Sequence, residues 1–470
     1  RDRSPSRGLG DVYKRQTISI ADANKGFKVL QGSELTITPI VDSFLETNYS
    51  WQINGEDISN ELTCTLPTIE LGEYQVRFAT HNEDGDDEVT FKVEVCSPDQ
   101  VDFNWTFLQT EYNMSAGRTI RIKPVDVNNA LDAVYTWTVD NEQVQSGEND
   151  TYLFTSEQQG EHTVKVEMKN SYILATQTLK VNVCPPAGTY QRKISATSSA
   201  SMNKVYEYLP APGQFINENH NTTTMAEACT YAEERINQTA YVSLGGFGGY
   251  IIVGFDHSIV NDGDYNIAIT GNAFDGSSEP GIVWVMQDEN GDGLPNDTWY
   301  ELRGSEYGKA EAWQDYAVTY HKPTGIQLPT PWTDNHGQSG SIDYLGAFHR
   351  QDYYYPAWVK EKQYTLRGTR LKERNYDQSG NGTYWVNDSY EWGYADNFSA
   401  IDRLTDDDNY NAGPSDNHFK ISHAVTFDGK DANLKYVDFI KVQVGVNSKS
   451  GWLGEISTEV FGIKDFNMLE

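Results

Sequence analysis

The sequence predicts an all-β protein: two small sandwich modules followed by a larger, jelly-roll-like β-sandwich domain with long loops. Short runs that alternate apolar and polar residues recur between turn signals along most of the 470 residues, which is the pattern of half-buried strands. One unit occurs twice in the first part of the chain, and only one segment has convincing helical periodicity. A duplicated unit of short strands and a scarcity of helices together indicate sandwiches.

Residues 1–16 (RDRSPSRGLGDVYKRQ) do not read like the rest of the chain, because they are basic and the remainder is acidic. They closely resemble a translated sequencing-adapter read, and a basic tail is the alternative interpretation. We exclude them from fold reasoning as one excludes a fusion scar. If they are an artefact, the true N-terminus is missing, together with any signal peptide or lipid-anchor cysteine.

Residues 17–97, here called module 1, are predicted to form a small β-domain. Strand-like runs recur with turns between them, and residues 89–95 (VTFKVEV) alternate with period 2. Asn54-Gly55, directly after the strand that contains Trp51, is a strong signal for a two-residue hairpin.

Residues 98–186, here called module 2, repeat this plan. Trp137 follows Trp51 by 86 residues and Cys184 follows Cys96 by 88. A duplicated unit with a central Trp and short alternating strands predicts an immunoglobulin-like sandwich. Both copies have a Gly-Glu-x-x-Val step into a long strand, and the pattern resembles the polycystic-kidney-disease (PKD) type of that fold, in which a Gly-x-Tyr step precedes a late strand. Module 1 has Tyr74 at that position, and module 2 departs from the type with His162. Neither module carries a cluster of titratable groups suited to catalysis, so we expect both to be spacers.

Residues 187–470, here called the C-terminal domain, begin after Pro185-Pro186 and are predicted to form the larger sandwich. Thr224 and Glu227 form a capping box that begins the one convincing helix. The Gly-rich run 244–249 does not fit a nucleotide loop and is expected to be a bend between strands. Residues 281–286 (GIVWVM), 436–444 (YVDFIKVQV) and 459–463 (EVFGI) are predicted to be buried strands.

The segment 288–297 (DENGDGLPND) is the strongest metal-site candidate. Oxygen-bearing residues alternate and a Gly follows, as in loops that wrap Ca²⁺. Trp299 stands where an EF-hand places its closing Glu, so we expect a loop after a strand and not a helical EF-hand. A polar hairpin turn at Asp292-Gly293 is the alternative, and Glu301, Asp297 or a distant Glu279 could close the shell. The predicted ligands of a structural Ca²⁺ are Asp288, Asn290, Asp292, Leu294 and Asp297.

Long loops rich in Tyr and Trp are the predicted ligand-binding elements, because aromatic faces with polar tips suit a sugar or a large flat ligand. Asn387 and Asn397 lie nearby in sequence and could meet amides of such a ligand. The acidic run 406–409 is expected to be a solvated loop. The aromatic residues selected as ligand contacts are Tyr354, Trp358, Trp385, Trp392 and Tyr394.

Composition excludes several classes of function. The formal net charge of −32 argues against nucleic acid and anionic membrane surfaces, which require clustered Lys and Arg. No segment approaches the roughly 18 apolar residues that a transmembrane helix requires. The four cysteines lack CxxC spacing, and they permit two disulfides in an exported chain, with three possible pairings.

We expect no enzymatic activity. A serine-nucleophile elbow, an HExxH motif and a recognisable Cys/His pair are missing from the sequence. Asp297 with Glu301 would be a candidate carboxylate pair for glycan hydrolysis only if the loop holds no calcium.

Four longer motifs carry a family resemblance: 204–216 (KVYEYLPAPGQFI), 271–281 (GNAFDGSSEPG), 287–300 (QDENGDGLPNDTWY) and 451–461 (GWLGEISTEVF). They resemble gut-bacterial cell-surface proteins in which PKD-like modules precede one large C-terminal domain, some of them described as cobalamin-binding surface lipoproteins. The resemblance implies an exported, lipid-anchored protein of the outer membrane that captures a corrinoid and passes it to an outer-membrane transporter. Carbohydrate binding is the alternative, and a calcium-dependent glycan hydrolase is the third. No corrinoid-contacting residue follows from the resemblance.

Overall fold

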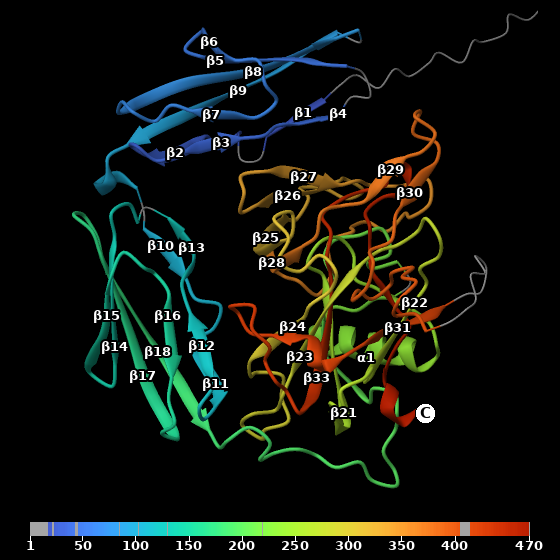
Figure 1. Cartoon of the computed structure of the whole chain (residues 1–470). Helices are drawn as coiled ribbons and strands as arrows, with labels where there is room; N and C mark the ends of the chain where they lie inside the picture. The colour runs from blue at the N-terminus through green and yellow to red at the C-terminus, as the bar shows by residue number, and fades with distance from the viewer. Residues whose placement is uncertain are drawn as a thin grey trace, which may run out of the picture. The chain divides into compact units, whose positions relative to one another are not determined.

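The computed structural model describes residues 17–20, 23–42, 46–83, 85–101, 103–128, 130–218, 220–404 and 414–469. The all-β prediction is confirmed, since strands dominate throughout (Figure 1). In the described ranges the only α-helix is α1 (Met225–Asn237). The chain divides into two compact units, residues 1–103 with 336–340 and residues 104–335 with 341–470.

Module 1 is built on a five-stranded sheet of order β2-β9-β8-β5-β6, flanked by the strand pairs β1-β4 and β3-β7. Its core contains the fully buried rings of Trp51 and Phe78. The hairpin predicted at Asn54-Gly55 joins β5 to β6. The strands are β1 (Thr17–Ser19), β2 (Phe27–Leu30), β3 (Leu35–Ile37), β4 (Ile40–Asp42), β5 (Asn48–Ile53), β6 (Glu56–Ser59), β7 (Cys64–Leu66), β8 (Gly72–Asn82) and β9 (Gly85–Cys96).

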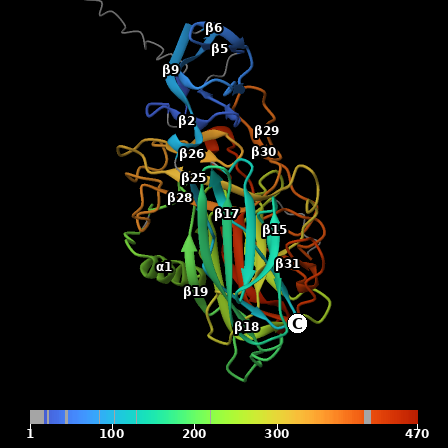
Figure 2. The same cartoon turned by 90° about the vertical axis from the view of Figure 1, so that its left-hand side faces the viewer.

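Module 2 follows the 3-10 turn η1 (Pro98–Gln100) and repeats this topology, with a sheet of order β11-β18-β17-β14-β15 (Figure 2). In each module the first strand of the main sheet pairs in parallel with the last one. Trp137 on β14 is fully buried, as Trp51 is in module 1. The strands are β10 (Asn104–Thr106), β11 (Glu111–Ser115), β12 (Thr119–Ile122), β13 (Val125–Asn128), β14 (Val134–Val139), β15 (Glu142–Gly147), β16 (Tyr152–Thr155), β17 (Gly160–Lys169) and β18 (Leu174–Cys184).

The C-terminal domain contains a six-stranded sheet, β19-β21-β33-β23-β24-β32, a four-stranded sheet, β27-β26-β25-β28, and a three-stranded sheet, β31-β22-β35. The strands are β19 (Lys204–Leu209), β20 (Val242–Ser243), β21 (Tyr250–Val260), β22 (Ile267–Gly271), β23 (Gly281–Met286), β24 (Trp299–Leu302), β25 (Trp313–His321), β26 (Thr330–Asp334), β27 (Ser339–Ile342), β28 (Gln363–Arg370), β29 (Asn375–Asp377), β30 (Trp385–Asn387), β31 (Ser415–Phe419), β32 (Ala424–Val425), β33 (Tyr436–Val444), β34 (Glu459–Val460) and β35 (Gly462–Asp465). Short 3-10 turns complete it: η2 (Ile421–His423), η3 (Gly451–Leu453) and η4 (Phe466–Met468).

The six-stranded sheet has two chemically different faces. Ile440 and Val442 on β33 are fully buried in the main core of the domain. Because side chains alternate along a strand, Lys441 points to the other face. There it lies opposite Trp284 on β23, which in turn lies opposite Glu301 on β24. One face of the sheet is therefore ordinary core, and the other carries polar and aromatic groups.

Local sequence signals account for several of these elements. The predicted strands 281–286 and 436–444 coincide with β23 and β33. Thr224 accepts the backbone N–H of Glu227 at the start of α1, as the capping box predicts. The Gly-rich bend lies between β20 and β21, and the predicted strand 459–463 is divided between β34 and β35.

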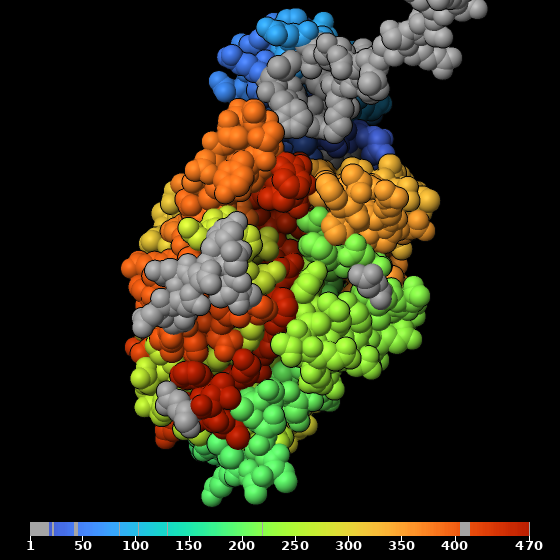
Figure 3. All heavy atoms as spheres, turned by 90° about the vertical axis from the view of Figure 1, so that its right-hand side faces the viewer, coloured from blue at the N-terminus to red at the C-terminus, as the bar shows by residue number. Residues whose placement is uncertain are grey.

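The two ends of the C-terminal domain meet at one surface. The backbone N–H of Met202 donates to the carbonyl of Ile463, and Ser201 forms a bridge with Lys464, so the green and red segments lie side by side in Figure 3. All four cysteine thiols are free in the structure. No helix in the described ranges has the length and apolar character that a membrane span requires. The terminal segment 1–16 and the acidic run 406–409 lie outside the described residues.

Candidate ligand-binding site

A cavity of about 630 Å³ lies between module 2 and the polar face of the six-stranded sheet. Its floor includes Trp284, Trp299 and Lys441, and its opposite wall includes Ile120 of β12 and Val125 of β13. Cavities of this size, with aromatic walls and a few polar groups, are typical of small-molecule sites. Module 2 therefore lines a site, which the spacer interpretation did not predict.

Two charged groups on the floor of this cavity have perturbed proton affinities. Burial lowers the pKa of the Lys441 ammonium to about 8. Burial also raises the pKa of the Glu301 carboxyl to about 7, although this carboxylate accepts a 2.5 Å hydrogen bond from the hydroxyl of Thr369. Perturbed groups in a cavity are characteristic of functional sites.

Module 2 is fixed to the C-terminal domain through Arg118. Its guanidinium lies 3.0 Å from the buried carboxylate of Glu289, and it donates to the side-chain oxygen of Gln287 at 2.7 Å and to the hydroxyl of Tyr300 at 3.0 Å. The backbone N–H of Ser115 donates to the other oxygen of Glu289 at 3.1 Å. Because Glu289 is almost completely buried, these contacts are needed to offset its desolvation.

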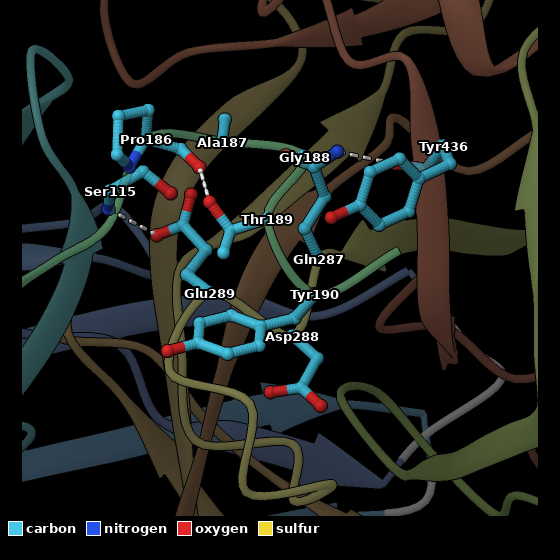
Figure 4. A pocket seen from close by; sticks show the side chains of 10 residues that line it. All are labelled: Ser115, Pro186, Ala187, Gly188, Thr189, Tyr190, Gln287, Asp288, Glu289 and Tyr436. Carbon is cyan, nitrogen blue, oxygen red and sulfur yellow. Dashed lines mark hydrogen bonds between the residues drawn. The ribbon is translucent and has the colours of Figure 1, made fainter. Parts of the chain in front are cut away.

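Figure 4 shows this junction from close by, with the segment Pro186 to Tyr190 passing beside Asp288 and Glu289. The side chain of Gln287 donates to the carbonyl of Tyr436 at 2.9 Å, which ties the start of the loop to β33. The end of module 2, the linker and the predicted calcium loop therefore meet at one place.

The structure brings the predicted calcium ligands into one loop between β23 and β24. Asp288 accepts the backbone N–H groups of Gly291 and Gly293 at 2.8 and 3.0 Å, and Asp292 accepts that of Leu294 at 2.7 Å. Both glycines have positive φ, 76° and 72°, which explains why glycine occupies these turns. The side chain of Asn290 donates to Asp292 at 2.9 Å.

Asp297 is the member of this loop whose environment best fits a cation. One oxygen accepts the backbone N–H of Glu289 at 2.9 Å, whereas the other is buried and has no hydrogen-bond partner among the described residues. Burial raises the pKa of this carboxyl to about 8. An all-oxygen donor set with an unpaired buried carboxylate oxygen fits a hard ion such as Ca²⁺.

Three of the five predicted aromatic contacts are part of the core. The ring of Tyr354 is buried, and its hydroxyl donates to the carbonyl of His349 and accepts the N–H of Leu345, both at 3.0 Å. Trp358 is buried and donates to the carbonyl of Tyr208, and the buried Tyr394 accepts the N–H of Glu306. As folded, these three rings offer no open face to a ligand.

Trp385 and Trp392 remain partly exposed, but the structure does not bring them into the large cavity. Trp392 lines a smaller cavity of about 230 Å³ together with His418 and His423. Asn387 and Asn397 are buried and hydrogen-bonded within the protein, to Ser450 and to the backbone of Tyr390 respectively.

A carboxylate cluster was not predicted from sequence. Glu279, Asp396 and Glu459 each place an oxygen within 4.8 Å of the others, so Glu279 belongs here and not to the calcium loop. Burial raises the pKa of Asp396 to about 7 and that of Glu459 to about 8. No sequence spacing joins these residues, because they come from three distant segments.

The two modules match the PKD-like domain, over residues 17–82 and 107–170. Modules of this kind are typical of extracellular and cell-surface proteins. Comparison with curated proteins found no match.

Solved structures similar to the chain consist of immunoglobulin- or fibronectin-like modules. The fibronectin(III)-like modules of Clostridium thermocellum CbhA are 16% identical, with 38% of this chain and 100% of that chain covered and a TM-score of 0.20. A chimeric titin Z1Z2-Z1Z2 tandem is 15% identical, with 34% and 94% covered and a TM-score of 0.15. Titin-A168169 is 16% identical, with 34% and 94% covered and a TM-score of 0.17.

Proposed function

We propose that this protein captures a small molecule at the bacterial cell surface and binds it in the 630 Å³ cavity between module 2 and the C-terminal domain. The observation that carries the proposal is the lining of this cavity, in which the rings of Trp284 and Trp299 stand beside a partly buried ammonium. Such a mixture suits a ligand with apolar faces and polar edges.

The ligand we propose is a corrinoid, which the protein would hand to an outer-membrane transporter while anchored to that membrane by a lipid. The choice of ligand and location rests on the sequence resemblance, and the cavity supplies a site with suitable chemistry. We also propose a structural Ca²⁺ held by Asp288, Asn290, Asp292, Asp297 and the carbonyl of Leu294. Bound beside the Glu289 contact to Arg118, the ion would stiffen the part of the C-terminal domain on which module 2 docks.

Calorimetry on the full chain tests this proposal. Cyanocobalamin should titrate at one site per chain, while neutral oligosaccharides should give no heat. Trp299→Ala should weaken binding by about tenfold or more, as expected for a buried aromatic anchor. Trp385→Ala is the matched control, since this Trp lies outside the cavity and should leave affinity unchanged. Binding that depends on Trp385 and not on Trp299 would place the site in the aromatic loops.

Carbohydrate chemistry is the second candidate, and one observation favours it. Asp297 and Glu301 both line the cavity, and burial raises the pKa of their carboxyl groups to about 8 and about 7. A carboxyl protonated near neutral pH can act as a general acid in glycoside hydrolysis. We nevertheless propose binding without catalysis, because Asp297 belongs to the calcium loop. Heat from an oligosaccharide, or release of reducing sugar that Glu301→Gln abolishes, would favour the alternative.

A further inference from the structure

Lys441 is an unusual residue for its position. It lies within the nine-residue strand β33, in which every other residue is buried. Its neighbours across the sheet are Ile252 and Trp284. A charged ammonium on the floor of a half-enclosed cavity loses hydration, so a counter-charge is normally required.

The carboxylates of Glu207 and Glu301 lie near enough to oppose part of the lowering of the Lys441 pKa, but neither forms a direct ion pair with it. In the described ranges, no carboxylate lies within ion-pairing distance of the Lys441 ammonium. Its contacts are aromatic: the nitrogen lies 4.7 Å from the ring centre of Trp284, 5.2 Å from that of Trp299 and 5.8 Å from that of Tyr250. Cation–π contacts orient an ammonium but offset only part of its desolvation.

The other cations that line the cavity are all paired. Arg121 and Lys123 both contact Asp315, at 3.1 and 2.7 Å, and Arg367 contacts Asp126. Over the whole chain acidic residues outnumber basic ones by 68 to 36, whereas the described lining of this cavity holds four of each. The cavity is therefore much less negative than the rest of the protein, and among the described residues that line it Lys441 is the one cation without a direct ion pair.

We propose that the ligand carries an oxyanion, a phosphate or a carboxylate, and that this group pairs with the ammonium of Lys441 between the rings of Trp284 and Trp299. This inference rests on the proposed function, because it assumes that the cavity is the ligand site. The apolar part of the ligand lies against the two indole rings, and the oxyanion supplies the direct ion pair that Glu207 and Glu301 do not form. A neutral ligand would leave the ammonium unpaired and would bind more weakly.

Two corrinoids and two sugars distinguish the possible sources of the oxyanion. Cyanocobalamin contains a phosphodiester, and cobinamide has the same corrin ring without it. An oligouronate carries carboxylates, and a neutral oligosaccharide of the same length does not. Each probe is titrated into the full chain and into Lys441→Met, Lys441→Arg and Lys435→Met, the last being a control at an exposed lysine just before the same strand.

The expected result is that Lys441→Met weakens binding of the acidic probe by about 10- to 100-fold, the range for a hydrogen bond to a charged group. Lys441→Arg should keep most of the affinity, and Lys435→Met should have no effect. The affinity for the neutral probe of each pair should be the same in wild type and in Lys441→Met. Inorganic phosphate should compete in wild type and not in Lys441→Met. Removing this partly buried charge should not unfold the protein, and melting curves check this.

The outcomes separate the two proposals. If cyanocobalamin binds wild type and Lys441→Met equally, the oxyanion inference is wrong and the proposed function stands. If cyanocobalamin does not bind wild type, the corrinoid function is wrong, and the oligouronate then decides the inference. Oligouronate binding that Lys441→Met weakens supports the oxyanion site, whereas no binding of either acidic probe overturns it.

Discussion

Replacing Arg118 by Ala should undock module 2 from the C-terminal domain. The substitution removes the guanidinium that lies 3.0 Å from Glu289 and the two hydrogen bonds to Gln287 and Tyr300. The side chain of Glu289 is 1% exposed, so its carboxylate would be left buried with the N–H of Ser115 as its hydrogen-bond donor. Breaking a buried pair in this way costs about 3–5 kcal/mol.

Urea denaturation of the full chain measures the loss of free energy, and limited proteolysis of residues 185–190 reports undocking. Lys180→Ala is the matched control, because Lys180 pairs with Glu161 on the surface of the same module, with 53% and 54% of the side chains exposed. Such a pair contributes about 0–1 kcal/mol. In the double variant Arg118→Ala with Glu289→Gln no charge is left unpaired, so part of the stability should return. An effect of Arg118→Ala no larger than that of Lys180→Ala, with unchanged proteolysis, would refute the docking role.

Three further predictions concern the individual parts of the chain. The double variant Asp288→Ala with Asp292→Ala should have a lower melting temperature in Ca²⁺ than wild type, and adding a chelator should no longer change it, because a bound ion stabilises by mass action. A wild-type melting temperature that does not change when chelator is added would contradict the calcium site. In module 2, the carbonyl of Gln158 and then Asp140 raise the pKa of His162, against its burial. A raised folded-state pKa gives stability that is fully present below the ordinary value of about 6.5 and is lost as pH rises through the folded-state value. His162→Gln should therefore flatten the pH dependence of module 2 unfolding, and an unchanged profile would show that His162 is not its source. In module 1, Trp51→Ala should cost about 3–5 kcal/mol in urea denaturation, since this ring is fully buried, and a loss below about 1 kcal/mol would mean that the core collapses around the gap.

Local patterns predicted the strands and the helix of this fold well. In a regular element the buried side chains recur at a fixed spacing, so the local sequence shows which side faces the core. The apolar run 436–444 became β33, and the capping box at Thr224 became the start of α1. The loop aromatics behaved differently, since irregular segments have no periodicity to show which side faces the core. Tyr354 and Tyr394 are core residues although both lie in irregular segments.

The cavity could not be predicted from local patterns, because its walls come from segments far apart in the sequence. Two signals for it were nevertheless present. In a strongly acidic chain, Arg121 lies on β12 and Lys123 directly follows that strand, and both contact Asp315 of the C-terminal domain. Lys441 interrupts an otherwise buried strand. A cation among neutral or acidic residues therefore indicates either a partner elsewhere in the fold, as for Arg121 and Lys123, or a place for a ligand, as proposed for Lys441.

The parallel pairing of β11 with β18 has a mechanical consequence. These strands lie near the two ends of module 2, and five residue pairs, from Glu111–Lys180 to Ser115–Cys184, hold them together. A tensile force applied to the two ends of the module pulls neighbouring parallel strands in opposite directions. The ladder is then loaded in shear, so its evenly spaced hydrogen bonds must break together and not one after another. Module 2 should therefore resist stretching along the chain far better than peeling from a strand edge, and the rate of its forced unfolding should be set by this ladder.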